Sequence, residues 1–94
     1  MAEVRWLPDA LGDLKRLHAF IDPHSPNAAA RAVKTLIAAA ETLAAFPERG
    51  RPWDLEMDYR ELPVRFGASG YVIRYRVFEG QVFVVRVWHA LEER

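Results

Sequence analysis

Three apolar runs separated by two turn signals dominate the C-terminal part of the chain, between Tyr59 and His89. The runs are rich in Val, Ile, Phe, Tyr and Trp, the residue types that favour strands. The tetrapeptide at 67–70 (GASG) and the dipeptide at 79–80 (EG) interrupt them. This pattern predicts a three-stranded antiparallel meander, and the upstream part of so short a chain must then cover it.

The two turns predict how the strands pair. We expect a four-residue loop at 67–70 and a two-residue loop at 79–80. The predicted partners are Phe78 with Gln81, Arg76 with Phe83, Arg74 with Val85, Val72 with Val87, Phe66 with Tyr71, Val64 with Ile73, and Leu62 with Tyr75. Because side chains alternate across a strand, one face then collects the core. Its predicted members are Leu62, Val64, Phe66, Tyr71, Ile73, Tyr75, Val77, Val82, Val84 and Trp88.

The same alternation predicts a second sheet face that mixes arginines with apolar side chains. A solvated face normally carries polar residues at alternate positions, and this one does not. Its predicted members are Glu61, Pro63, Arg65, Val72, Arg74, Arg76, Phe78, Phe83, Val85 and Val87. The face therefore suits a cover that is apolar and acidic. Arg86 conflicts with this register because it would point into the core, and a β-bulge near the end of the last strand would re-aim it.

A short strand and two helices are predicted before the meander. The strand is expected at Glu3 to Trp6, and the first helix at Pro8 to Ile21. The second helix is expected from the N-cap Ser25 to Phe46, with an apolar stripe that includes Val33 and Ile37, and residues 48–58 are expected to form a loop. The fold class is therefore α+β: an N-terminal strand, an antiparallel two-helix hairpin and a three-stranded antiparallel meander that forms one sheet.

Composition limits the classes of protein that this chain can belong to. Ninety-four residues, 51% hydrophobic and 28% charged, predict one globular domain over residues 1–94. The 13 basic and 13 acidic residues balance, which argues against a protein that wraps nucleic acid through its phosphates. Cysteine is absent, so disulfide, zinc-thiolate and thiol chemistry are excluded. No stretch approaches the about 20 apolar residues of a membrane span, and a cytoplasmic location is expected.

Histidines provide few candidates for a chemical site. His18, His24 and His89 lack the spacing of metal ligands, so neither a metal site nor a cofactor is predicted. His89 follows a strand whose neighbour carries Arg74, and a histidine beside a cation can act as an acid or base. The alternative for His89 is a partly exposed residue that hydrogen-bonds to the backbone.

Arginines of the second sheet face provide the other candidates. Arg65, Arg74 and Arg76 can bind a phosphate or the carboxylates of a protein partner. The alternative is that they merely solvate an exposed face. That alternative explains the neighbouring Phe83 and Val85 poorly.

Five segments together resemble a known family over nearly the whole chain. These are VRWLPDALGDLKRL near the start, PERGRPW in the middle, then RELPV, GYVIRYRV and VVRVWHALEER. In this order they resemble the ParE branch of the RelE/ParE toxin superfamily. The resemblance implies the RelE/ParE-like fold and the toxin component of a type II toxin-antitoxin system.

The resemblance also implies partners and a mode of action. ParE-like toxins inhibit DNA gyrase and so DNA replication, they act in plasmid stabilization, and a ParD-type antitoxin neutralises them by covering the helical hairpin and the sheet. We therefore expect a cytoplasmic hetero-oligomer with the antitoxin, contact with DNA only through the antitoxin, and no enzymatic activity. The residues expected to bind the antitoxin are Arg65, Arg74, Arg76, Phe83, Val85, Val87, Val33 and Ile37.

The alternative is a ribosome-dependent mRNA endonuclease of the RelE type. Such nucleases carry a basic residue directly after the GY of the penultimate strand, whereas this chain has Val72 there. Their C-terminal tail carries further basic and aromatic catalytic residues, whereas the tail of this chain reads His89, Ala90, Leu91, Glu92, Glu93 and Arg94. If the chain were a nuclease, Arg74 and His89 would be its catalytic residues. A third hypothesis is a degenerate toxin that acts only as a binding module.

Overall fold

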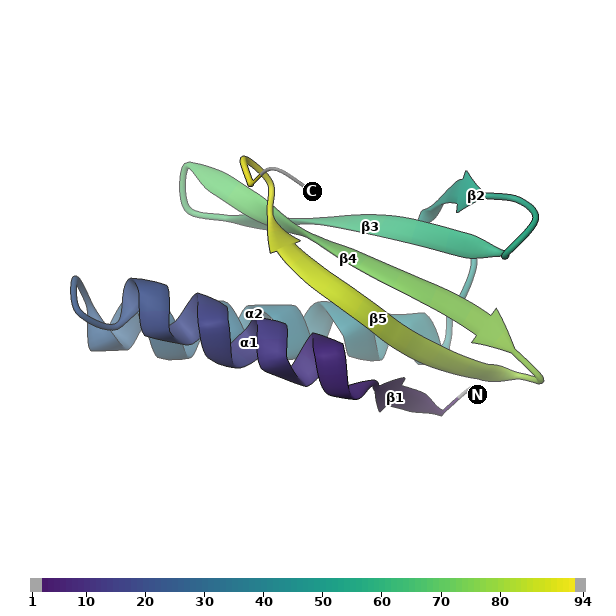
Figure 1. Ribbon diagram of the computed structural model, residues 1–94, viewed down its shortest axis with the longest axis horizontal. Helices are drawn as coiled ribbons and strands as arrows, with labels where there is room; N and C mark the ends of the chain where they lie inside the picture. The colour runs from purple at the N-terminus through teal and green to yellow at the C-terminus, as the bar shows by residue number, and fades with distance from the viewer. Residues whose placement is uncertain (1–2, 93–94) are drawn as a thin grey trace.

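A five-stranded sheet with two helices on one face forms the domain (Figure 1). The structure is a computed structural model, and it describes residues 3–92. The elements are β1 (Val4–Trp6), α1 (Pro8–Ile21), α2 (Pro26–Glu41), a 3-10 turn (Thr42–Ala44), β2 (Arg51–Asp54), β3 (Tyr59–Phe66), β4 (Ser69–Phe78) and β5 (Gln81–His89). The strand order is β1-β5-β4-β3-β2, with β1 parallel to β5 and the other pairs antiparallel. The α+β fold class is confirmed. Within the described range, no helix has both the length and the hydropathy that a membrane crossing requires.

Local signals place the helices where the sequence predicts them. α1 begins at Pro8 and ends at Ile21, as expected. α2 begins at Pro26, and the Ser25 hydroxyl caps it by accepting a hydrogen bond from the Ala28 N–H at 3.1 Å. Its α-helical part ends at Glu41 and a 3-10 turn follows, so the predicted end at Phe46 was too late.

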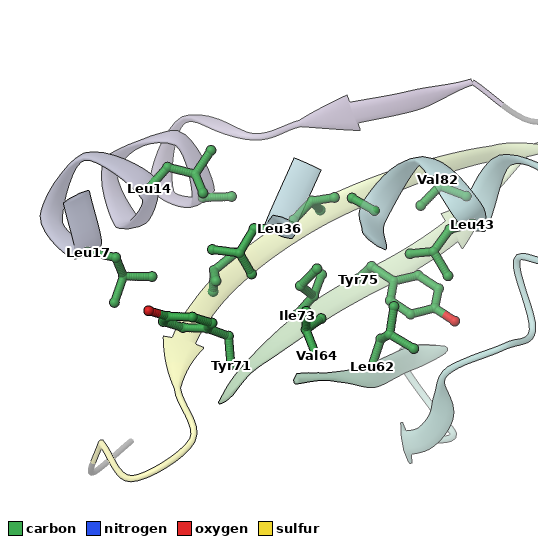
Figure 2. Close-up of a cluster of buried hydrophobic side chains, with 14 of the residues drawn as sticks. Leu14, Leu17, Leu36, Leu43, Leu62, Val64, Tyr71, Ile73, Tyr75 and Val82 are labelled. Atoms are coloured by element: carbon green, nitrogen blue, oxygen red, sulfur yellow. The ribbon is translucent and has the colours of Figure 1, made fainter. Parts of the chain in front are cut away.

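The core lies between the helices and the sheet (Figure 2). Three of the four buried residues of α2 are alanines, which let this helix approach the strands closely. The fully or nearly fully buried residues include Ala10, Leu17, Ala32, Leu36, Ala40, Leu43, Ile73, Tyr75, Val82 and Val84. The predicted core face is therefore correct for β4 and for the first half of β5.

The edge strand β2 was missed by the sequence analysis, which expected a loop at 48–58. Arg51 and Pro52 pair with β3, and a register shift before Asp54 leaves Trp53 as the extra residue. A proline in a four-residue run is typical of a loop, but an edge strand tolerates it because one side of the strand needs no hydrogen-bond donor. The sheet consequently has one strand more than predicted.

The turn between β3 and β4 is tighter than expected. Phe66 pairs with Ser69 and Val64 with Tyr71, so the loop contains only Gly67 and Ala68 and the four-residue loop was wrong. The predicted partners are off by two residues. Because every second side chain of a strand lies on the same face, a shift of two residues leaves each side chain on the predicted face of the sheet.

The turn between β4 and β5 has the predicted length, and a bulge follows it. Phe78 pairs with Gln81, and Glu79 and Gly80 both adopt positive φ angles (50° and 75°), which this two-residue loop requires. Further along, Tyr75 pairs with Val84 but Arg74 pairs with Arg86, which leaves Val85 as the extra residue of a β-bulge. The strand therefore contains a bulge of the kind that would re-aim Arg86.

Two predicted residues change faces because of this bulge. Val87 pairs with Ile73 and is completely buried in the core, so its assignment to the second face and to the antitoxin-binding set was wrong. Trp88 pairs with Val72 and lies on the second face instead of in the core. The one-residue shift explains both corrections.

Candidate functional site

The sheet face opposite the helices, here called the open face, carries two cross-strand rows of side chains. Residues paired directly across neighbouring strands project on the same side. The acidic row consists of Arg51, Glu61, Arg74 and Arg86. The aromatic row consists of Asp54, Tyr59, Arg76, Phe83 and Arg5. The two rows place their arginines in different environments.

Arg74 of the acidic row is held by internal contacts. Its Nε and Nη2 donate to the same Glu61 carboxylate oxygen at 3.1 and 2.7 Å. Its guanidinium carbon lies 3.5 Å from the centroid of the Trp53 ring and 4.6 Å from that of Trp88. The side chain is only 17% exposed. A partner would therefore find the charge of Arg74 already balanced and largely shielded.

Replacing Arg74 with Met should lower the free energy of unfolding by about 2–3 kcal/mol, because the buried Glu61 carboxylate loses two charge-assisted hydrogen bonds. Urea-induced unfolding followed by circular dichroism measures this loss. Combining Arg74→Met with Glu61→Leu should recover part of it, since the carboxylate is then gone. An Arg74→Met chain as stable as the parent would contradict this role for the pair.

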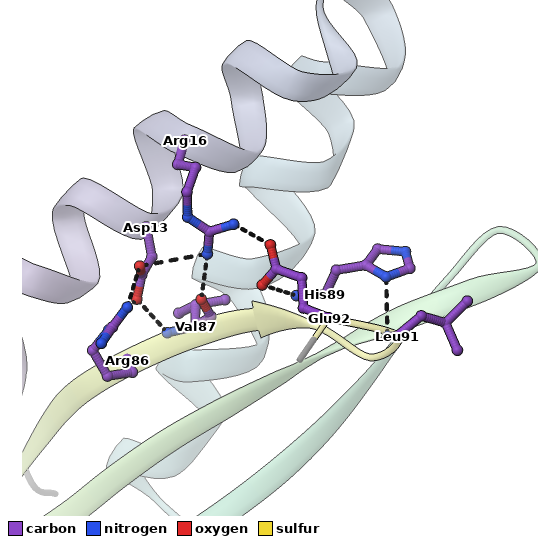
Figure 3. A network of polar contacts seen from close by, with 7 residues as sticks. All are labelled: Asp13, Arg16, Arg86, Val87, His89, Leu91 and Glu92. Atoms are coloured by element: carbon purple, nitrogen blue, oxygen red, sulfur yellow. Dashed lines mark hydrogen bonds and ion pairs between the residues drawn. The ribbon is translucent and has the colours of Figure 1, made fainter. Parts of the chain in front are cut away.

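Arg86, the last residue of the acidic row, is bound to helix α1 (Figure 3). Asp13 is 4% exposed and accepts from Arg86 Nε at 2.8 Å, from Arg86 Nη2 at 3.1 Å and from the Val87 N–H at 2.8 Å. Burial alone would raise the pKa of Asp13, but the hydrogen bonds from Arg86 and Val87 and the charges of Arg86 and Arg16 outweigh it and hold that pKa below its usual 3.8. Asp13 therefore fastens the bulged strand to the helix.

The same side chains cap the edge of β5 beyond the end of β1. Arg16 donates to the Val87 carbonyl at 3.3 Å, Asp13 accepts from the Val87 N–H, and the His89 N–H donates to Glu92 at 3.3 Å. Arg16 also pairs with Glu92 (Figure 3). An unpaired strand edge is a template for another strand, so these contacts close this stretch of the edge.

Arg74 and His89, the catalytic residues of the nuclease alternative, are not brought together. His89 pairs with Tyr71, and the two rings meet edge to face at 5.5 Å on the side of the helices. Its Nδ1 accepts from the Leu91 N–H at 3.1 Å. Arg74 projects from the open face with Glu61. The sheet itself separates the two side chains.

Arg76 of the aromatic row differs from Arg74. It lies beside a depression of about 260 Å³ in the open face. The lining residues are Leu7, Tyr59, Arg76, Phe78, Phe83 and Val85. Among residues 3–92, no carboxylate forms an ion pair with Arg76, and its buried Nε has no hydrogen-bond partner. Its guanidinium only faces the Phe78 ring, at 5.1 Å from the centroid.

The other residues predicted to bind the antitoxin are divided between two sides of the molecule. Arg65 is exposed on the open face, where Phe83 and Val85 are half-buried. Val33 and Ile37 belong to α2 in the helical layer, where Ile37 is 40% exposed. Val33 lines a shallow groove between α1 and α2. A single partner that touched both sets would have to reach around the domain.

An apolar groove on the helical side was missed by the sequence analysis. It lies between the C-terminal half of α1 and the end of β5, and its volume is about 570 Å³. Leu17, Ile21, Phe66 and Tyr71 line it, and the exposed Phe20 and Leu91 stand at its rim. Phe20 was the available signal, because it is a large aromatic residue outside the buried stripe of its helix.

The roles of Asp13 and Trp53 were also missed. Asp13 follows Ala10 by three residues and precedes Leu17 by four, so it falls on the buried stripe of α1, where a carboxylate needs a partner. That position is a readable signal, although it does not identify Arg86 as the partner. Trp53 carries no such signal, because its stacking on Arg74 depends on the unpredicted strand β2.

Comparison with known proteins finds one family over nearly the whole chain. The family model described as "ParE toxin of type II toxin-antitoxin system, parDE" matches residues 4–94. Toxin RelE3 of Caulobacter vibrioides is 40% identical over the full length of both chains, and Toxin RelE2 of the same species is 44% identical over 96% of this chain and 97% of its own. The putative toxin Y4kP of Sinorhizobium fredii is 34% identical over 96% of this chain and 90% of its own.

A solved structure supports the fold. A chain from the "Chromosomal ParDE TA system from P. aeruginosa" superposes with a TM-score of 0.75 and covers 95% of this chain and 96% of its own. The two sequences are 21% identical, so this likeness concerns the fold alone.

Proposed function

Because the chain belongs to the ParE toxin family of type II toxin-antitoxin systems, we propose that it inhibits DNA gyrase, and so DNA replication, by binding. A ParD-type antitoxin neutralises it in the cytoplasm, and the pair contributes to plasmid stabilization. Contact with DNA comes only through the antitoxin.

One observation supports binding over chemistry most strongly: Arg74 and His89 lie on opposite faces of the sheet. General acid–base catalysis needs its groups within hydrogen-bond reach of one substrate. Arg74 is in addition paired with Glu61 and stacked on Trp53. This arrangement favours a toxin that blocks its target by occupying it.

The open face supports an antitoxin as the neutralising partner. Phe78, Phe83, Val85 and Trp53 are all at least partly accessible there, and no helix covers them. Covering this face removes apolar surface from water at about 25 cal/mol per Å², from which the ordering of the antitoxin must be subtracted. The family model that matches the chain is that of a parDE system, which supports ParD as the antitoxin type.

The second candidate function is ribosome-dependent cleavage of mRNA. The names of the relatives from Caulobacter vibrioides, RelE1, RelE2 and RelE3, favour it. His89 would then act at the mouth of the apolar groove, without Arg74 beside it.

Expression of the chain without its antitoxin separates the two functions. We expect plasmid DNA to lose supercoiling while translated messages stay intact, and co-expression of the antitoxin to restore growth. His89→Ala is the matched control, because a gyrase inhibitor should tolerate it and a nuclease should not. Cleaved messages with normal supercoiling would overturn the proposal, as would expression that leaves the host unharmed.

A further inference from the structure

We infer that Arg76 determines which partner the open face accepts, by binding a carboxylate in an acidic segment of the antitoxin whose neighbouring apolar side chain fills the depression beside it. This inference rests on the proposed neutralisation by an antitoxin. It adds the contact residue and the chemistry of the segment that is recognised.

Arg76 differs from Arg5, Arg74 and Arg86 in having no internal acidic partner. Arg74 is paired with Glu61, Arg86 with Asp13, and Arg5 with Glu3 at 3.4 Å. Among the described residues, no carboxylate pairs with Arg76. Among the described residues of the two rows, an external anion can therefore still balance the charge of Arg76 and that of the exposed Arg51 on the edge strand. Of these two, Arg76 is the one that lines the depression.

The environment of the Arg76 guanidinium decides which of its nitrogens an anion can reach. Its Nε is buried without an acceptor among the described residues, which destabilises the free chain. The terminal nitrogens are not buried in this way, and the two oxygens of an external carboxylate can accept from both of them at once, a two-pronged geometry that arginine and carboxylates favour. Such a contact would balance the unpaired charge.

The residues around Arg76 indicate which side chain should adjoin the acidic residue in the antitoxin segment. Leu7, Phe78, Phe83 and Val85 supply the apolar part of the lining of the depression. An acidic residue that reaches Arg76 would place an adjoining side chain over this lining, where an apolar one is favoured. The expected segment therefore carries an acidic residue flanked by an apolar one.

A protein segment fits this site better than nucleic acid does. Binding through phosphates uses several cations along a backbone, whereas Arg76 is the one cation among the described lining residues, and the chain has no net charge. The rings of Tyr59 and Phe83 can stack on bases, so single-stranded RNA is the rival occupant that the test must exclude.

The test measures the affinity of the purified chain for the antitoxin encoded in the same operon, by isothermal titration calorimetry. Arg76→Met should weaken binding by about 30-fold or more, since it removes one partner of a desolvated charge pair. Its melting temperature should equal or exceed that of the parent, because the unsatisfied Nε is gone. The control is Arg65→Met, the same charge change at an exposed position of the same face, and it should weaken binding by less than about fivefold.

Two further sets of variants test the same contact if Arg76→Met does not fold. Arg76→Lys keeps the charge but loses the two-pronged donor, and it should bind more weakly than the parent. Changing the acidic residues of the antitoxin to their amides, one at a time, should reveal one position with the same loss as Arg76→Met and little added loss when the two changes are combined.

The outcomes separate this inference from the proposed function. If the parent chain does not bind the antitoxin, the proposed neutralisation fails and the inference fails with it. If the parent binds but Arg76→Met and Arg76→Lys bind equally well, the inference alone is wrong. Binding of single-stranded RNA that Arg76→Met abolishes, with unchanged affinity for the antitoxin, would also overturn it.

Discussion

Replacing Asp13 with Ala should lower the free energy of unfolding by about 3–5 kcal/mol, a large part of the stability of a domain of this size. Asp13 is nearly inaccessible and accepts four hydrogen bonds, two from Arg86, one from the Val87 N–H and one from Arg16. Without this carboxylate, the Arg86 guanidinium and the buried Val87 N–H lose their acceptor. The strand would also lose the contact that holds Val87 in its position beyond the bulge.

Chemical unfolding followed by circular dichroism measures this loss. Asp13→Asn keeps the shape and one acceptor oxygen, so it should fall between the parent and Asp13→Ala. Asp9→Ala is the matched control, because Asp9 is an exposed carboxylate in the first turn of the same helix and its loss should change stability by less than about 1 kcal/mol. Equal losses at the two positions would argue against the buried network.

The lowered pKa of Asp13 also predicts how stability depends on pH. A carboxyl whose pKa is lower in the folded than in the unfolded chain contributes stability that is fully present above its usual pKa of 3.8 and is lost as the pH falls through its folded pKa. The difference in unfolding free energy between the parent and Asp13→Asn should therefore be constant near neutral pH and shrink below about pH 4. A difference that stays the same down to strongly acidic pH would contradict the assigned shift.

Replacing Gly50 with Ala should lower the free energy of unfolding by about 3 kcal/mol, because the new methyl group has no room. Its carbon would lie 2.6 Å from both Cε1 and the hydroxyl oxygen of Tyr75, and 3.0 Å from the Glu61 carbonyl oxygen. Tyr75 cannot move aside. It is completely buried, and its hydroxyl donates to the Pro47 carbonyl at 2.7 Å and accepts from the Gly50 N–H at 2.8 Å.

Gly12→Ala is the matched control for this substitution. Gly12 lies inside α1 with nothing within 4 Å of the added carbon, so alanine should stabilise the helix by about 0.5–1 kcal/mol. The two variants should thus shift the thermal unfolding midpoint in opposite directions. Equal stability of Gly50→Ala and the parent would show that the Tyr75 contact is looser than the structure indicates.

Local patterns predict the parts of this fold that depend on neighbouring residues. Pro8 and the Ser25–Pro26 pair mark helix starts through backbone geometry and capping, and Glu79–Gly80 marks its turn through positive φ angles. The register beyond the bulge was only partly predictable. Arg86 signalled a conflict, but the position of Val87 depends on Asp13, which is 74 residues away.

The sequence predicts which residues share the open face, but it does not predict which of them form internal contacts and which are left to bind a partner. The sequence places Arg74 and Arg76 side by side and cannot distinguish them. They differ because Glu61 and Trp53 come from strands whose register or existence was predicted incorrectly. Exposed apolar residues such as Phe20 and Leu91 form a groove only when α1 and β5 are placed together.

Labelling of a single cysteine tests most directly whether the open face binds the partner. The chain has no cysteine, so Phe78→Cys introduces a unique thiol at a half-exposed position beside Arg76, and Phe20→Cys places one at the rim of the groove for comparison. We predict that the thiol at position 78 reacts readily with iodoacetamide in the free chain and becomes protected in the complex with the antitoxin. A thiol at position 78 that reacts equally fast in both states, whether or not position 20 is protected, would contradict the account.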